Sequence, residues 1–117
     1  MATTESARPR TALHAHNVFF TLHDGSPARR EGLVRDCYEY LEGHDGVVAL
    51  SAGTRAEGCE RDVNDVAFHV SLHMVFRDRA SHDAYQTAPR HMQFVERNRA
   101  NWKTVRVFDS TLPPLTR

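Results

Sequence analysis

Histidine is the most conspicuous chemistry-bearing residue of the chain, with eight copies in 117 residues: His14, His16, His23, His44, His69, His73, His82 and His91. His91 lies six positions after Tyr85, and Pro89 separates the two. A neutral imidazole takes up a proton near neutral pH, and a phenol donates a hydrogen bond to a developing oxyanion. The pair therefore suits enolisation, isomerisation or aldol chemistry without a cofactor. The alternative is structural: Tyr85 packs on a helix, and His91 satisfies a backbone carbonyl at the start of the next helix.

Four histidines lie in segments that alternate like strands, which raises the question of a metal site. His14 and His16 share one face of the first such segment, and His69 and His73 share one face of a later one. Residues four apart in a strand are about 13 Å apart, so His69 and His73 cannot bind one ion. The two segments are expected to be neighbouring central strands that run parallel, so His16 and His69 could meet at the strand starts, but only if both faced the same way. Because no cysteine or carboxylate completes a set at recognisable spacing, the sequence predicts no metal site.

No familiar cofactor or nucleophile motif occurs in the chain. It has no glycine-rich phosphate loop, no Gly-x-Ser-x-Gly elbow and no Cys-x-x-Cys pair, so we expect no cofactor. Cys37 falls in a helical pattern and Cys59 in a polar stretch, which does not make a disulfide framework. Cys37 is interpreted as a small buried apolar residue, with a reactive thiol as the alternative. Asp109, at the end of a strand, is expected to cap it or to pair with Arg106.

Hydrophobic periodicity indicates which elements must position these residues. Residues 14–22 alternate: Val18 and Phe20 share one side with His16, while Phe19 lies on the other, as in a strand. After a turn, Ser26 is a candidate N-cap for a helix of about four turns that ends before Gly43. The later elements are a strand over 47–52, a charged connector over 54–65, a strand over 66–76, a short helix from Ser81 to Tyr85, a second helical segment from Pro89 with Met92 and Val95 facing inward, and a strand over 104–109.

The resulting order is β-α-β-β-α-β, which is the ferredoxin-like arrangement of the α+β class. The strands carry bulky apolar groups on both sides, since Phe19 opposes Phe20 and Val75 opposes Met74 and Phe76. A sheet with helices on only one side would leave half of these groups in water. The pattern therefore predicts a homodimer that packs sheet to sheet.

Composition narrows the range of partners and locations. Lys plus Arg and Asp plus Glu number 15 each, so attraction to nucleic acid or to an anionic membrane is not expected. No run approaches the length of a membrane span, and residues 1–13 lack the apolar core of a signal peptide. We therefore expect a cytoplasmic domain over residues 14–110, preceded by a disordered arm over 1–13 and followed by an irregular tail over 111–117.

Three stretches carry a resemblance to a known family. Residues 16–20 resemble the opening strand of the stress-responsive A/B-barrel (Dabb) family, which often begins with a His before an apolar run. Residues 85–95 resemble the family's second helical region, in which a Tyr, a Pro and a His recur at this spacing before a Phe. Residues 105–109 resemble its closing strand, which ends in an Asp. The similarity covers residues 14–110.

The resemblance implies a ferredoxin-like subunit, a dimer whose two sheets close into a barrel, and a cavity between sheet and helices. Most members have no known activity, but a plant polyketide cyclase of the family uses a Tyr and a His for an intramolecular aldol cyclisation. By position these correspond to Tyr85 and His91, and another histidine of that cavity corresponds to His16. The chain departs from the family at Ala88, where a His is common. His69 lies one residue from the histidine that heads the cyclase's third strand, an offset that reverses the face in a strand.

Three functions follow as hypotheses. The first is a binding module that encloses a small apolar or aromatic molecule, with ligand contacts from His16, His69, Phe20, Tyr85 and His91. The second is a cofactor-free acid/base enzyme, of cyclase, isomerase or lyase type, acting on a carbonyl compound with Tyr85 and His91 as catalytic residues. The third is a structural dimer that acts in stress. Related dimeric α/β barrels include cofactor-free monooxygenases and haem-degrading enzymes. Haem chemistry is therefore a further alternative function.

Overall fold

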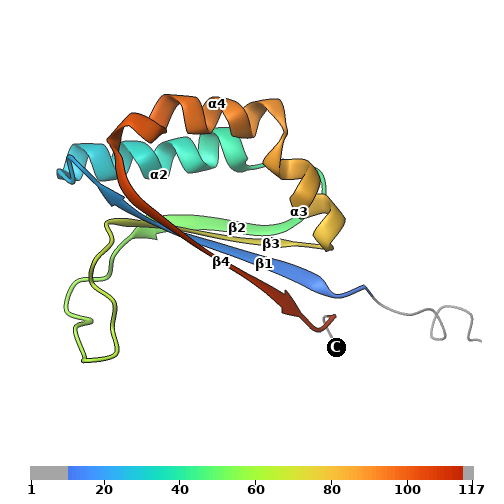
Figure 1. Cartoon of the computed structure of the whole chain (residues 1–117), viewed down its shortest axis with the longest axis horizontal. Coiled ribbons are helices and arrows are strands. Elements are labelled where there is room, and N and C mark those ends of the chain that lie inside the picture. The colour runs from blue at the N-terminus through green and yellow to red at the C-terminus, as the bar shows by residue number, and fades with distance from the viewer. Residues whose placement is uncertain (1–10, 115–117) are drawn as a thin grey trace, which may run out of the picture.

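The fold is a four-stranded antiparallel sheet with helices on one face, described here from a computed structural model over residues 11–114. The strand order is β2-β3-β1-β4, and the prediction of a ferredoxin-like α+β fold is confirmed. The elements are β1 (Leu13–Leu22), α2 (Pro27–Leu41), β2 (Val47–Thr54), β3 (Val70–Phe76), α3 (Arg79–Gln86), α4 (Pro89–Asn98), the 3-10 turn η1 (Arg99–Asn101) and β4 (Trp102–Leu112). Figure 1 shows α2 and α4 side by side across the sheet and α3 at one end of it.

The central strand β1 explains why one face of the sheet is apolar and carries histidines. Its alternation places Val18 and Phe20 under the helices, and His14 and His16 lie on the same face, each only 6% exposed. Val18 pairs with β3 on one side and with β4 on the other. Because β1 is hydrogen-bonded along both edges, side chains on this face are held at fixed positions.

The helices bury one apolar stripe each against that face. The Ser26 side chain accepts a hydrogen bond from a backbone N–H of the first turn of α2, and Leu33, Cys37 and Leu41 form its buried stripe. In α4 the buried residue is Phe94, so the expectation that Met92 faces inward is wrong; Met92 is 54% exposed. Among the described residues, no helix has the length and apolarity to cross a membrane.

Helix α3 lies close to the start of β2 because a glycine leaves room for it. The side chain of Asp78 caps α3 by accepting from the Ser81 N–H at 2.8 Å. Ser81 lies directly over Gly46, where a Cβ atom would collide with the serine side chain. Gly46 also has a φ of +87°, which favours glycine. This close approach places the side chains of α3, including Tyr85, over the sheet.

Several expected boundaries and one pairing direction differ from the structure: the second strand ends at Thr54, the short helix spans Arg79–Gln86, and the last strand spans Trp102–Leu112. The third strand begins at Val70 rather than at residue 66, since residues 66–68 have no regular secondary structure and His69 lies in a bend. The sheet also extends beyond 14–110, since Leu13 pairs with Leu112. The expected arm and tail otherwise fall on residues 1–10 and 115–117, outside the described residues. The two central strands β1 and β3 were expected to run parallel, but they are antiparallel.

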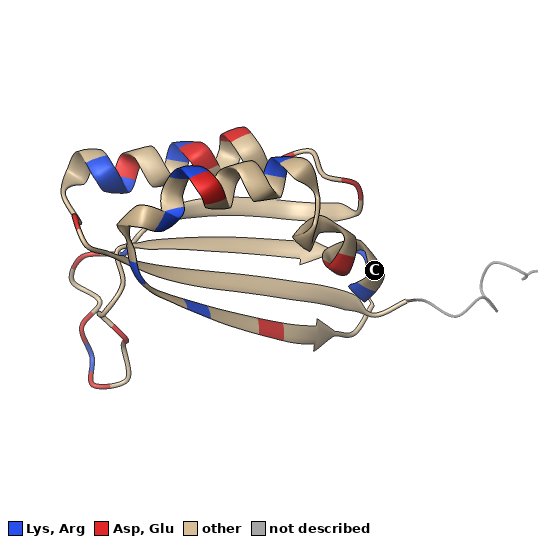
Figure 2. Ribbon diagram, turned by 45° about the horizontal axis from the view of Figure 1, so that its top comes forward, with Lys and Arg blue, Asp and Glu red and all other residues tan. Residues whose placement is uncertain are grey.

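The face of the sheet away from the helices is part apolar and part polar. Phe19 contacts Phe68 and Phe108 edge to face, with ring centroids 5.0 and 5.7 Å apart. Beside them, Asn17 and His73 are hydrogen-bonded across β1 and β3 at 2.7 Å. Figure 2 shows charged residues gathered on the helices and the connecting loop, whereas the strands carry few. This face therefore has little charge to keep it in water.

Candidate functional site

A small cavity lies between the sheet and the helices α3 and α4. Its volume is about 120 Å³, and most of its wall is apolar, including Phe20, Phe94 and Val107. The polar side chains that reach it are His16, Tyr85, Gln86 and His91. An apolar protein cavity of about 150 Å³ is known to hold benzene, so this space suits a ring or a short chain with one or two polar atoms.

The structure brings Tyr85 and His91 together although the sequence spacing did not fix their separation. Tyr85 is on α3 and His91 on the first turn of α4, and the break between the two helices turns both rings toward the sheet. Their ring centroids are 4.6 Å apart. His16 reaches the same space from β1, with its ring centroid 6.0 Å from that of Tyr85. Three elements, β1, α3 and α4, therefore each deliver one polar ring to the same cavity.

Burial sets the protonation of these rings. Tyr85 is 3% exposed, and burial raises the pKa of its phenol, with the neighbouring Cys37 adding to the effect. Burial likewise lowers the pKa of His91 and is the largest cause of the lowered pKa of His16. The Nδ1 atom of His91 is buried and has no hydrogen-bond partner within residues 11–114. At neutral pH the site thus presents a protonated phenol and a neutral imidazole, the forms needed for a hydrogen-bond donor and a base.

The other two residues predicted to contact a ligand fall in different places. Phe20 is 2% exposed and lines the cavity. His69 lies near the opposite end of β1, where its Nδ1 accepts a hydrogen bond from the Leu22 N–H at 2.9 Å and its ring packs against Gly25. It is therefore roughly 20 Å along the strand from His16, because the antiparallel pairing places the start of β3 beside the end of β1. The structure does not bring His69 to the cavity.

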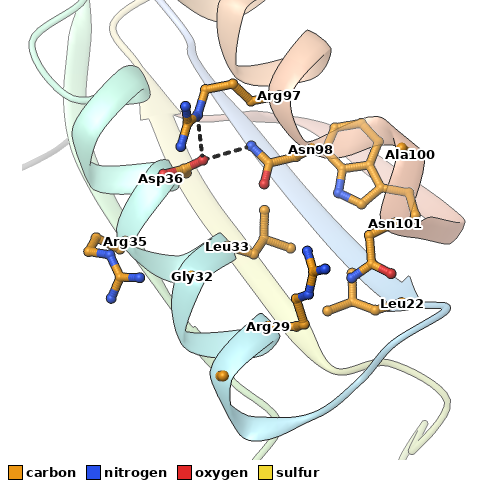
Figure 3. A pocket seen from close by; sticks show the side chains of 12 residues that line it. Leu22, Arg29, Gly32, Leu33, Arg35, Asp36, Arg97, Asn98, Ala100 and Asn101 are labelled. Atoms are coloured by element: carbon orange, nitrogen blue, oxygen red, sulfur yellow. Dashed lines mark hydrogen bonds and ion pairs between the residues drawn. The ribbon is translucent and has the colours of Figure 1, made fainter.

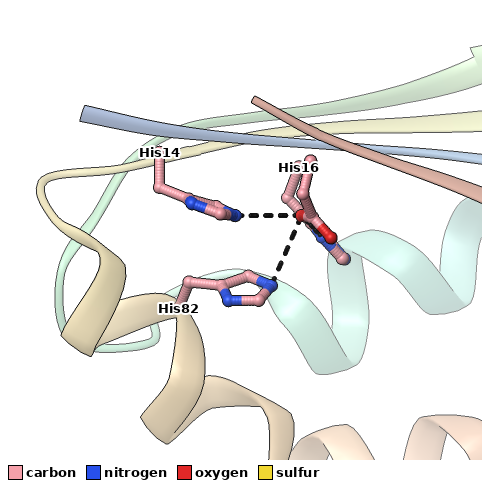
Figure 4. Close-up of side chains that lie close together, drawn as sticks. His14, His16 and His82 are labelled. Carbon is pink, nitrogen blue, oxygen red and sulfur yellow. Dashed lines mark hydrogen bonds and ion pairs between the residues drawn. The ribbon is translucent and has the colours of Figure 1, made fainter. Parts of the chain in front are cut away.

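A second group of titratable side chains adjoins the cavity at the end of the sheet. His14 and His16 from β1, His82 from α3 and Asp109 from β4 form this His–Asp cluster, and one ligand atom from each lies within 4.8 Å of the others. Figure 4 shows the rings of His14 and His82 lying over one another, with dashed lines meeting at one carboxylate oxygen. All three histidines are less than 9% exposed, so the cluster is mostly shielded from water.

Hydrogen bonds to Asp109 organise the cluster. His14 Nε2 donates to Asp109 Oδ1 at 2.9 Å and His16 Nδ1 donates to the same oxygen at 2.7 Å. Burial opposes ionisation of Asp109, but these two hydrogen bonds, together with the charges of His16 and His82, hold the pKa of the carboxyl below its usual value. The expected pairing of Asp109 with Arg106 is wrong, since Arg106 pairs with Asp65 at 2.7 Å.

Part of this cluster was predictable from the sequence. His14 and His16 were placed on one strand face, which the structure confirms, but the search for a third ligand considered His69. His82 and Asp109 were missed because their proximity to His14 and His16 depends on the register of β4 and on where α3 packs against the sheet. His16 pairs directly with Asp109 across β1 and β4, so a correct register alone would have found the carboxylate.

A larger cavity of about 290 Å³ lies elsewhere, between α2 and the end of α4 (Figure 3). Arg97 and Asn98 both donate to the Asp36 carboxylate there, each at 3.1 Å. Leu33 and Trp102 contribute apolar surface. No residue predicted to be catalytic or to bind a ligand lines this cavity. The smaller cavity is therefore the candidate functional site, because it contains the paired Tyr85 and His91.

Comparisons with known proteins agree with this architecture. A Dabb family protein from Mesorhizobium loti with a ferredoxin-like fold is 24% identical, with a TM-score of 0.69 over 91% of this chain and 100% of that chain. A dimeric ferredoxin-like protein of unknown function from Thermobifida fusca is 11% identical, with a TM-score of 0.72 over 91% and 96%. The hydroxynitrile lyase from Passiflora edulis is 14% identical, with a TM-score of 0.71 over 93% and 100%.

No curated protein matches the sequence. The sequence model of the stress responsive A/B barrel domain family (Dabb), in contrast, matches residues 15–112, which span β1 through β4 and include both Tyr85 and His91. The chain therefore belongs to the Dabb family of stress-responsive A/B barrel domains.

Proposed function

We propose that the domain binds a small apolar or aromatic molecule in the cavity between the sheet and α3–α4. The observation that carries the proposal is the convergence of His16, Tyr85 and His91 on a space that is otherwise apolar. Specific ligand sites have this composition, with an apolar wall that supplies affinity and a few polar groups that fix orientation. The unpartnered Nδ1 of His91 would gain a hydrogen bond from such a ligand.

The edge strand β4 supplies the entrance to this cavity. Val105 and Val107 line the cavity from β4 and are 39% and 48% exposed, whereas Phe20 and Phe94 at its far wall are buried. A ligand would enter past the two valines and place its polar atom toward Tyr85 and His91. A larger side chain at the entrance should therefore compete with the ligand for the same volume.

Phenol is a suitable first probe, because it combines one apolar ring with one polar atom. Titration monitored by ¹H–¹⁵N NMR should shift the backbone signals of residues around the cavity. The variant Val107→Phe should abolish these shifts, and Val48→Phe is the matched control, since Val48 is 50% exposed on β2 and does not line the cavity. Shifts spread evenly over the surface, or unchanged in Val107→Phe, would contradict binding at this site.

A second candidate function is cofactor-free acid/base catalysis in the same cavity. The adjacent rings of Tyr85 and His91, a protonated phenol beside a neutral imidazole, favour it. The fold is shared with a hydroxynitrile lyase, so cleavage of an aromatic hydroxynitrile is a reasonable assay. In that reaction His91 would take the hydroxyl proton while the bond to the nitrile carbon breaks, leaving a carbonyl compound and cyanide.

The catalytic hypothesis requires that both rings matter. Tyr85→Phe and His91→Ala should each lower turnover by about a hundredfold or more, the usual contribution of a general acid or base. His23→Ala, at an exposed position that does not line the cavity, is the control and should keep full activity. Equal turnover in all three variants would remove Tyr85 and His91 from the mechanism.

We also propose that two copies pack through the outer faces of their sheets. Phe19, Phe68 and Phe108 support this proposal, as does the dimeric state named for several proteins of the same fold. Sedimentation should detect a dimer that Phe108→Asp dissociates and that Val63→Asp, at an 81% exposed loop position, leaves intact. A purely structural role in stress would fit a dimer with neither ligand binding nor turnover. A monomer at micromolar concentration would contradict the sheet-to-sheet dimer.

A further inference from the structure

We propose that the His–Asp cluster is a binding site for a divalent transition-metal ion of the zinc class. His14, His16 and His82 would supply three imidazole nitrogens, and Asp109 would supply one carboxylate oxygen. Sets of imidazole and carboxylate ligands suit zinc and its neighbours, whereas magnesium and calcium prefer sites made of oxygen alone. Nothing in the ligand-binding proposal for the neighbouring cavity depends on this ion.

The distances between the ligand atoms are close to those of a four-coordinate site. With metal–ligand bonds of about 2.0 to 2.1 Å, tetrahedral ligand atoms lie about 3.3 Å apart. Asp109 Oδ1 lies 2.7, 2.9 and 3.5 Å from the nearest nitrogens of His16, His14 and His82. The largest separation in the set is 4.8 Å or less.

The ligands come from elements that are held rigidly. His14 and His16 are two apart on the central strand, Asp109 lies opposite His16 on β4, and His82 is fixed by the packing of α3 against the sheet. The rings of His14 and His82 already lie 4.2 Å apart between centroids. Preorganisation of this kind lowers the entropic cost of collecting four ligands around an ion.

The protons of the cluster can be accounted for. In the structure His14 Nε2 and His16 Nδ1 each donate a proton to the carboxylate. An ion needs both nitrogens as lone-pair donors, so each neutral ring must carry its proton on the opposite nitrogen when the ion is bound.

A carboxylate outside the cluster orients the third histidine. His82 Nδ1 donates to Asp83 Oδ1 at 3.0 Å, which leaves the lone pair of His82 Nε2 directed at the other ligands. This is the arrangement that usually holds a zinc-binding histidine. The Gln86 side chain donates to the same nitrogen at 3.3 Å and would have to turn away when an ion binds.

The test is to titrate Zn²⁺ into the metal-stripped full chain in competition with a chromophoric chelator. One ion per chain should bind, and Co²⁺ in its place should give the visible absorption of four-coordinate cobalt. His14→Ala and Asp109→Asn should each lower the affinity by at least about tenfold and remove the cobalt absorption. His23→Ala, at an exposed histidine outside the cluster and away from the outer face of the sheet, is the control and should bind as the wild type does.

Asp109→Asn keeps the shape of the side chain, so it remains informative if His14→Ala fails to fold. His91→Ala, which alters the cavity but not the cluster, should also bind one ion; its retention separates this proposal from the ligand-binding one. The absence of stoichiometric binding to the wild type would overturn the metal site. Loss of affinity in the control variants as large as in His14→Ala and Asp109→Asn would overturn it too, because the ion would then lie elsewhere.

Discussion

Replacement of Gly46 by alanine tests how the chain positions helix α3. Gly46 and Gly58 have nearly the same backbone conformation, with φ of +87° and +86°. They differ in what surrounds them: a Cβ at Gly46 would collide with the Ser81 side chain, whereas no atom lies within 4 Å of one at Gly58. Gly58→Ala is therefore a matched control that reports backbone strain alone.

The expected free energies follow from these two surroundings. An alanine at a left-handed position destabilises the folded state by about 1 to 2 kcal/mol, which is the whole effect expected for Gly58→Ala. Forcing an extra methyl group into a packed contact costs about 1 to 3 kcal/mol more. Gly46→Ala should therefore lower the free energy of unfolding by about 2 to 5 kcal/mol. Because the colliding atom includes Ser81 Cβ, relief requires a shift of α3 itself.

Urea denaturation of both variants measures the two free energies under the same conditions. Since α3 carries His82 and Tyr85, its displacement should also change the chemical shifts of these residues in Gly46→Ala, while Gly58→Ala leaves them unchanged. Equal destabilisation by the two substitutions would refute the reasoning, because it would show that the space under Ser81 does not constrain α3.

Three further predictions concern protonation, thiol reactivity and packing. Burial lowers the pKa of His16 and His91 in the folded protein below the ordinary value of 6.5, so the unfolded chain binds more protons than the folded one in acid. The free energy of unfolding should therefore fall as the pH drops below about 6.5. Urea midpoints that stay constant from pH 7.5 to 5.5 would contradict this. Burial raises the pKa of Cys37 to about 12, so iodoacetamide should modify only the exposed Cys59 of the native protein. Mass spectrometry that shows rapid alkylation of both cysteines would contradict this. Leu41 is fully buried, so Leu41→Ala should lower the free energy of unfolding by about 2 to 5 kcal/mol by denaturation, and a loss under 1 kcal/mol would argue against its place in the core.

Strand faces were predictable because alternation is a local property. The sequence correctly placed His16, Val18 and Phe20 on one side of β1, but it did not indicate that this side faces the helices. The same rule failed at the start of β3, where the alternation continues through Phe68 although the strand has not begun. Phe68 is apolar for another reason: it packs on Phe19 on the outer face, which periodicity alone cannot distinguish from a core position.

Pairing between strands was the step at which prediction became unreliable. The expectation that β1 and β3 run parallel allowed His16 and His69 to meet, and the antiparallel pairing separates them. Register is decided by the summed packing of whole strands rather than by any single residue. For that reason Asp109, opposite His16, was assigned to a neighbour in sequence, Arg106, instead of its partner across the sheet.

The placement of Tyr85 and His91 depended on a resemblance, because spacing across a helix break does not fix a distance. The break at Pro89 is local and was predicted, since proline suits the first turn of a helix. The angle between α3 and α4 is set by contacts between residues far apart in sequence, including the close approach of Ser81 on α3 to Gly46. Side chains that share one face of a strand can thus be grouped from the sequence. Side chains that meet between two helices can be grouped only when the fold is known.

The ring of His16 belongs to both groups of polar side chains, since it bonds Asp109 through Nδ1 and also forms part of the cavity wall. A metal ion in the cluster and a ligand in the cavity would share the His16 ring, so their binding is thermodynamically linked. If the ion changes the affinity for the ligand by some factor, the ligand changes the affinity for the ion by the same factor. Substitution of His16 would disturb both at once and could not assign an effect to either. His14 and His91, which each belong to only one group, are the positions at which the two can be dissected separately.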